Sequence, residues 1–330
     1  MRFLSLFLCL AVLGVSASAA RSSGTVSLVA DFPLGPAAHY GEAKLIAAIQ
    51  SAGSQVESVK SSATATGDTI IELKMTPRPP AESLAIGKLV VGGKPTWRLD
   101  GADDRGLMYA LLDVAERIGW SEKSGDLFAH VREVKEQPAI RDRCLSVYTM
   151  NRAYWESRFY DESYWTRYFE LLSANRFNRF LLIFGYENGG FLAPPYPYFF
   201  DTPGFPGVHM LNLTAEQQRR NLAALNRLIE LAHAHGITVT LGIWDHIYRA
   251  GVQTGGANWV DEYNGRSVPN SVEGVTTENL NAYTLASLQE LIARVPAMDG
   301  LHFRIHEESG LKRAEMEDFW REVFTHVRKT

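Results

Sequence analysis

The chain has 330 residues, of which 46% are hydrophobic and 21% charged, so it is long enough for two domains and has an ordinary globular composition. Its formal net charge of -4 provides no basic field that would attract phosphates. We therefore expect no nucleic-acid partner.

The first twenty residues predict a secretory signal peptide. Arg2 precedes an apolar run at residues 3–15, and small residues follow at 16–20. The apolar run is shorter than the roughly 20 residues that a membrane span needs, and no later stretch is long enough. We expect a secreted or periplasmic protein with no integral membrane segment after signal removal. Only Cys144 would then remain, which excludes an intramolecular disulfide, and its apolar neighbours favour a buried thiol.

Residues 21–138 show short strands and two helices, the pattern of a small α+β domain. Strands are predicted at 25–30, 69–75, 88–94 and 96–99, and helices at 41–52 and 103–118. Asp103 or Asp104 can cap the second helix. Residues 125–139 contain mixed charges and a proline, which is typical of a connection between domains.

From residue 139 to 330 a strand is followed by a helix four times. The strands are predicted at 143–148, 177–184, 237–244 and 301–305, and the helices at 162–174, 215–235, 278–294 and 313–327. This order indicates parallel strands with right-handed crossovers, which suits either a flavodoxin-like open sheet or the first four units of a TIM-type (β/α)8 barrel. The long loops after the second and third strands favour the half barrel. The predicted fold class is therefore α/β, with a small α+β domain followed by part of a (β/α)8 barrel.

Polar and aromatic residues follow the ends of all four predicted strands, where the active sites of such barrels lie. These residues are Arg152 after the first strand, Glu187 and Asn188 after the second, Trp244, Asp245 and His246 at the third, and Arg304, His306, Glu307 and Glu308 at the fourth. Aromatic faces beside planar polar groups suit sugar rings, so we predict a carbohydrate substrate. The aromatic loop at 191–205 is either a further stacking surface or a packed cover.

The adjacent carboxylates Glu307 and Glu308 are the strongest chemical signal in the chain. Glycosidic cleavage needs a protonated carboxyl that gives its proton to the leaving oxygen, and usually a second carboxylate as base or nucleophile. We assign the acid to Glu308, with Glu307 or His306 adjusting its pKa. The structural alternative is an acidic pair that stabilises the positive end of the following helix.

A metal site was weighed against this hypothesis. Asp245, His246, His306 and Glu308 could together bind a divalent ion, and such a hydrolase would lose activity with chelators. The local spacings that bring metal ligands together, HxH on the first strand and HExxH on a helix, are absent, so we predict no metal. No glycine-rich phosphate loop follows a predicted strand, so we predict no nucleotide or other cofactor. Nothing in the sequence indicates an oligomeric state.

Two segments resemble known glycoside hydrolases. Residues 101–116 resemble the closing helix of the small α+β domain that precedes the barrel in family 20 hexosaminidases and family 67 α-glucuronidases. Residues 168–178, which include Ala174-Asn175-Arg176-Phe177-Asn178, are similar to the first helix and second strand of those barrels. The resemblance implies an exported glycoside hydrolase that acts on a polysaccharide or oligosaccharide.

The two families differ at the fourth strand. The α-glucuronidase acid is a Glu after this strand, and Glu308 is the similar position here, whereas the base carboxylates of that family would lie beyond Thr330. Hexosaminidases have an Asp-Glu pair at the end of this strand, and the Asp orients the substrate acetamido group that serves as nucleophile, but this chain has Glu307-Glu308. The resemblance therefore favours an α-glucuronidase-like hydrolase. The alternatives are a β-N-acetylhexosaminidase-like hydrolase and a non-catalytic carbohydrate-binding remnant.

Overall fold

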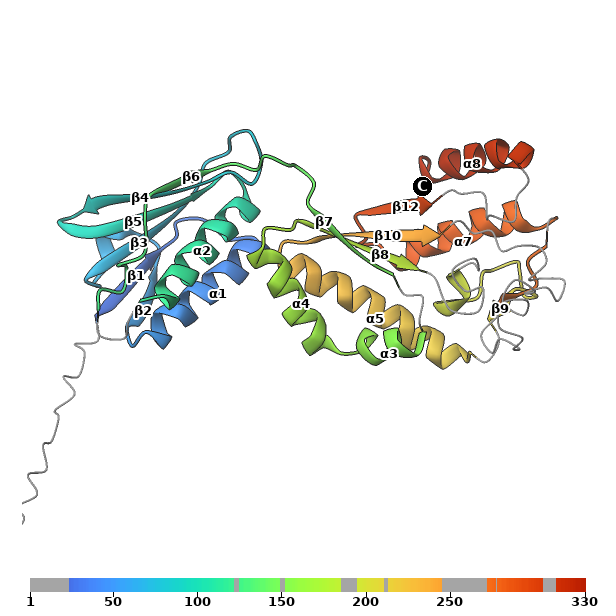
Figure 1. Cartoon of the computed structure of the whole chain (residues 1–330), viewed down its shortest axis with the longest axis horizontal. Coiled ribbons are helices and arrows are strands. Elements are labelled where there is room, and N and C mark those ends of the chain that lie inside the picture. Colours follow the sequence, from blue (N-terminus) through green and yellow to red (C-terminus); the bar gives the residue numbers. More distant parts are fainter. Residues whose placement is uncertain are drawn as a thin grey trace, which may run out of the picture.

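The computed structural model describes residues 24–121, 125–148, 152–184, 195–210, 213–244, 272–276, 278–304 and 313–330. Two sheets, each with its own hydrophobic core, form two units that lie side by side along the long axis (Figure 1). The predicted signal peptide lies outside the described residues. None of the helices in the described ranges combines the length and the apolar character that crossing a membrane requires.

The first unit contains a six-stranded sheet in the order β2-β1-β3-β5-β4-β6. Its strands are β1 (Thr25–Val29), β2 (Gln55–Val59), β3 (Thr69–Met75), β4 (Leu84–Val91), β5 (Lys94–Gly101) and β6 (Val134–Glu136). Strands β2, β1, β3 and β5 are parallel, whereas β4 is antiparallel to both of its neighbours. Gly92 and Gly93 have φ values of 59° and 82°, and this conformation allows the two-residue turn between β4 and β5.

Two helices, α1 (Pro36–Ser51) and α2 (Asp104–Gly119), pack on one face of this sheet (Figure 1). Asp103 caps α2, because its Oδ1 accepts a hydrogen bond from Gly106 N at 2.8 Å. Asp104 instead caps α1, accepting from Ala37 N at 2.9 Å. Helix α1 begins earlier than predicted, at Pro36, since proline suits the first position of a helix.

Two strands of this sheet were not predicted. Strand β2 is mostly half-exposed and lacks a clear apolar alternation, and β6 has only three residues. Strand β6 lies inside the segment 125–139 that the sequence indicated as a connection between domains. It pairs with β4, so residues 134–136 belong to the first sheet and not to a connection between domains, as the sequence had indicated.

The second unit contains four parallel strands in the order β12-β10-β8-β7. They are β7 (Cys144–Tyr148), β8 (Arg179–Phe184), β10 (Thr238–Trp244) and β12 (Gly300–Arg304). Each of these four strands pairs with the one that comes next along the chain. A flavodoxin-like sheet places its first strand between the second and third, so the described order differs from that alternative.

Five helices contribute buried side chains to one core on one face of this sheet. They are α3 (Arg152–Phe159), α4 (Glu162–Ala174), α5 (Ala215–Ala234), α7 (Leu280–Arg294) and α8 (Arg313–Val327). Leu182 of β8 and Leu241 of β10 belong to this core, whereas Leu181 and Ile183 form a separate small cluster. Cys144 packs on that second cluster, outside the main core. It was predicted to be a buried thiol, but it is only half-buried. This partial burial raises the pKa of the thiol.

The two long loops of the second unit contain regular structure of their own. The loop after β8 includes a short 3-10 helix, η3 (Tyr196–Tyr198), and strand β9 (His209–Met210). The loop after β10 includes β11 (Val272–Glu273), which pairs antiparallel with β9. The two loops therefore contact each other directly.

A prediction follows from the contact between α1 and α2. A Cβ atom at Gly41 would lie 2.9 Å from Leu111 Cβ and 3.1 Å from Met108 Cα. Glycine to alanine normally stabilises a helix by about 0.5–1 kcal/mol. Here the added methyl group must push the helices apart, so we expect Gly41→Ala to lower the free energy of unfolding by about 1–3 kcal/mol in urea titrations. Gly119→Ala, which would contact nothing within 4 Å, is the matched control. A Gly41→Ala variant as stable as the wild type would contradict this packing.

Candidate functional site

The carboxyl ends of the four parallel strands lie at one edge of the second sheet, which we call the carboxyl edge. The register pairs Ile243 of β10 with Phe184, the last residue of β8, and Trp244 with Arg304, the last residues of β10 and β12. Strand β7 ends at Tyr148, whose partner Ile183 is one residue before the end of β8. All four segments that carry the predicted site residues therefore follow strands that end at this edge.

The structure locates the backbone of three predicted site residues. Arg152 is the first residue of α3, Trp244 is the last of β10, and Arg304 is the last of β12. Trp244 and Arg304 are brought together as register partners. The other predicted residues lie outside the described residues: Glu187, Asn188, Asp245, His246, His306, Glu307 and Glu308. Their assignment remains a prediction.

A row of residues beside the carboxyl edge was not predicted. Tyr148 pairs with Ile183, and Ile183 pairs with Gly242. Gly242 in turn pairs with His302. Ile183 points away from the helix-covered core, so the row lies on the opposite face of the sheet. The signal was present in the sequence, because Leu301 and Phe303 flank His302 and alternate with it.

The two ends of this row are exposed and polar, and its middle is apolar. Tyr148 is 46% exposed and His302 is also exposed, whereas Ile183 is buried. Three interstrand spacings separate the two ends, about 14 Å in a flat sheet. A Cβ atom at Gly242 would lie 2.6 Å from Ile183 Cγ1, so the glycine is what lets Ile183 occupy the middle of the row. A phenol and an imidazole on either side of an apolar floor can bind a ring that has both C–H and hydroxyl groups.

The aromatic loop after β8 is a packed cover in its described part. Tyr196, Tyr198, Phe199 and Phe200 all belong to the core, with exposures between 0% and 4%. Burial raises the pKa of Tyr196 well above its ordinary value. Of the two interpretations left open for this loop, packing is therefore the one that applies to these four rings.

Hydrogen bonds attach this cover to the surrounding helices. Tyr198 Oη donates to Glu156 Oε1 of α3 at 2.7 Å, and Asn221 Nδ2 of α5 donates to Tyr198 O at 2.8 Å. Thr202 and Ser287 of α7 share a hydrogen bond of 2.8 Å between their hydroxyl groups. Because these bonds come from three helices, the cover is held in one position beside the carboxyl edge.

A cavity of about 780 Å³ lies at the opposite edge, where the strands begin. Both units line it, through residues that include Glu82 and Arg105 from the first unit and Asp142 and Arg179 from the second. Arg105 pairs with Glu82 at 2.5 Å and Arg179 with Asp142 at 2.6 Å. Since both carboxylates of the cavity are already ion-paired, it is a poor candidate for acid catalysis.

The described residues contain no group of three or more His, Cys, Asp or Glu side chains placed to hold a metal ion. The four residues of the metal hypothesis, Asp245, His246, His306 and Glu308, lie outside the described residues. The hypothesis of a metal site therefore stays untested.

Comparison with known proteins links the fold to glycoside hydrolases. No family model matches the sequence, and no curated protein matches it. A GH138 enzyme targeting pectin rhamnogalacturonan II has a TM-score of 0.66 and 16% identity, over 92% of this chain and 33% of its own. The chitobiase of Flavobacterium johnsoniae (FjGH20) has a TM-score of 0.51 and 14% identity, over 93% of this chain and 44% of its own. A β-N-acetylhexosaminidase of Bacteroides fragilis has a TM-score of 0.49 and 17% identity, over 83% of this chain and 51% of its own.

The likenesses to the GH138 enzyme and to the chitobiase confirm the predicted glycoside hydrolase fold. The described architecture is mixed α/β with parallel strands and helices, as such a fold requires. At 16% identity the likeness extends to the fold alone. The chain spans about one third of the GH138 enzyme and less than half of the chitobiase.

The packing of Gly242 against Ile183 can be tested by a double-mutant cycle. We expect Gly242→Ala to lower the free energy of unfolding by about 1–3 kcal/mol, because its methyl group overlaps Ile183. Ile183→Ala should cost about 2–4 kcal/mol by itself. The double variant should lose less than the sum, by about 0.5 kcal/mol or more, since the truncated side chain makes room.

The control for this cycle is Gly300→Ala, whose Cβ would lie 3.6 Å from the nearest atom, Thr240 Oγ1. We expect its effect to be additive with that of Ile183→Ala. Strict additivity of the Gly242 and Ile183 substitutions would show that these residues do not pack as described.

Proposed function

We propose that the chain belongs to an exported glycoside hydrolase that cleaves poly- or oligosaccharides by carboxylate general acid catalysis. The observation that carries the proposal is the sequential order of four parallel strands whose carboxyl ends share one edge, in a fold similar to that of a GH138 enzyme. The predicted polar residues follow these strands. In barrels of alternating strands and helices, catalytic groups come from the segments that follow the strands.

The proposal includes the domain organisation. Residues 1–20 would be the signal peptide, 21–138 a small α+β domain, and 139–330 the first half of a (β/α)8 barrel. Sequential strand order supports the half barrel, because a barrel closes by pairing each strand with the next. The two outer strands, β7 and β12, would then pair with strands of the second half.

Glu308 is the proposed general acid, and it follows β12, the fourth strand of the sheet. Glu307 or His306 would adjust its pKa by like-charge proximity or hydrogen bonding. His306 and the remaining predicted residues would bind the sugar: Arg152, Glu187, Asn188, Trp244, Asp245, His246 and Arg304. The register of Trp244 with Arg304 supports a shared subsite for these two.

An α-glucuronidase-like specificity is the preferred form of the proposal. The likeness to an enzyme targeting pectin rhamnogalacturonan II supports the inclusion of pectic fragments among the substrates to be tested. The likeness to a chitobiase, with its lower TM-score, favours a β-N-acetylhexosaminidase-like enzyme as the second candidate. Glu307, where that family has Asp, counts against it. A non-catalytic carbohydrate-binding role is the third.

Substitution of Glu308 tests the proposed acid. The 330-residue chain, and any longer product of its gene, would be assayed on aryl glucuronides, galacturonides and N-acetylhexosaminides and on pectic fragments. We expect Glu308→Gln to lower kcat/KM by about two to four orders of magnitude on one substrate class, because the amide cannot donate the proton. Glu317→Gln is the matched control, since Glu317 is exposed on α8 and pairs only with Arg321 among the described contacts.

The other outcomes separate the alternatives. Turnover restricted to N-acetylhexosaminides would favour the second candidate. A loss with Glu307→Gln but not with Glu308→Gln would move the acid to Glu307. Saccharide binding by the longest product without turnover would leave the non-catalytic role.

A further inference from the structure

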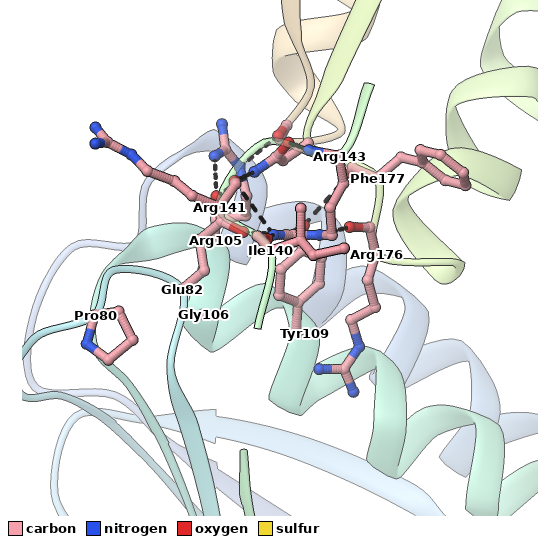
Figure 2. Close-up of polar contacts among 12 residues, drawn as sticks. Pro80, Glu82, Arg105, Gly106, Tyr109, Ile140, Arg141, Arg143, Arg176 and Phe177 are labelled. Carbon is pink, nitrogen blue, oxygen red and sulfur yellow. Dashed lines mark hydrogen bonds and ion pairs between the residues drawn. The ribbon is translucent and has the colours of Figure 1, made fainter. Parts of the chain in front are cut away.

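One buried carboxylate of the first unit, that of Glu82, contacts the second unit at the amino ends of its parallel strands. Glu82 precedes β4, has a backbone φ of 64°, and exposes 8% of its side chain. Its Oε1 accepts hydrogen bonds from Arg105 Nη1 at 2.5 Å and from Asn178 Nδ2 at 2.9 Å. Its Oε2 accepts one from Arg143 Nη2. Figure 2 shows Glu82 beside Arg105 and Arg143, and we call Glu82, Arg105, Arg143 and Asn178 the Glu82 network.

The members of the network reach the starts of three consecutive strands. Arg143 is the residue before β7, and Asn178 is the residue before β8. Arg105, at the start of α2 in the first unit, also donates from Nε to Gly236 O at 2.6 Å, just before β10. One carboxylate and one guanidinium of the first unit therefore contact three strand starts of the second.

The strand starts are also bonded to one another. Asn178 Oδ1 accepts from Arg143 N at 2.9 Å, which connects the starts of β7 and β8. Asn178 O accepts from both Thr238 N and Thr238 Oγ1 at 3.0 Å, which connects β8 to β10. Asp299 Oδ2 accepts from Val239 N at 2.7 Å and extends the chain of contacts to the start of β12. Each strand start is thus held both by the first unit and by a contact with its neighbour in the sheet.

The ion pairs of Glu82 with Arg105 and Arg143 explain why the contact between the two units is strong. Burial alone would raise the pKa of Glu82, but the hydrogen bonds from Arg143, Asn178 and Arg105 outweigh it and hold the pKa below its usual range. Loss of a buried partner leaves the opposite charges desolvated without compensation. Removal of the carboxylate would leave two guanidinium groups, with 25% and 19% of their side chains exposed, facing each other.

We propose that the first unit positions the second through the Glu82 network, setting the spacing and stagger of β7, β8 and β10. Strands of five, six and seven residues extend only about 17–23 Å. Because each is hydrogen-bonded to its neighbour along its length, a displacement at the start carries through to the carboxyl edge. The first unit then helps to set the geometry of the second unit, which carries the candidate site, and is not an independent module. This inference does not depend on the proposed function.

Hydrogen exchange of the full chain, measured peptide by peptide, tests the proposal. We expect Glu82→Gln to accelerate exchange by about tenfold or more in peptides that cover the starts of β7, β8 and β10, as local opening becomes easier. Arg105→Lys should accelerate exchange at the start of β10 and not at β7, because it removes the bond to Gly236 O. Arg143→Lys should show the reverse. Glu72→Gln is the control, since Glu72 pairs with Arg98 and Lys74 within the first unit.

The pattern across variants distinguishes positioning from general stabilisation. If Glu82→Gln accelerates exchange only in the first unit, the network is local to that unit and the proposal is wrong. If Arg105→Lys and Arg143→Lys give the same uniform acceleration in all strands, the network only adds global stability, which also overturns it. Should Glu82→Gln fail to fold, the strand-specific effects of the two lysine variants still decide the question.

Discussion

The second unit depends on one constraint: consecutive parallel strands must be neighbours while every connecting helix packs on the same side. Among the described residues, this places helices α3, α4, α5, α7 and α8 against one face and gives each strand two different faces. On β8, Leu182 faces the helices, whereas Leu181 and Ile183 face away from them. The same constraint brings every carboxyl end to one edge. The polar segments that follow the strands therefore start from a common line, although they are far apart in the sequence.

The helices could be predicted from the sequence where local signals were complete. Helices α4 and α8 have the predicted bounds, and Asp161 caps α4 by accepting from Tyr164 N. Short or polar elements could not be predicted in this way. Strand β6 exists because β4 offers it a partner, and α3 has mixed aromatic and charged residues without a clear apolar stripe. Such elements are stabilised by tertiary contacts that a local pattern does not contain.

The candidate site could be predicted as a location more readily than as a set of side chains. Strand order and direction place the strand ends at one edge, and this depends only on backbone pairing. Tyr148 and His302 were not predicted, because they lie within strands, on the face that the helices leave uncovered, whereas the predicted polar segments follow the strands. The polar contacts of Glu82 were also missed. A single glutamate before a strand gives no local sign that its partners come from three segments, two of which lie in the other unit.

The pairing of β9 with β11 has a consequence for how this chain can change in evolution or by design. The two loops approach so closely that a Cβ atom at Gly274 would lie 1.8 Å from Gly207 O, and Gly274 has a φ of 85°. An insertion in one loop would displace the strand that the other needs. Residues 207–210 and 272–274 therefore cannot vary separately. A loop transplanted from a protein of similar fold would have to bring its partner with it.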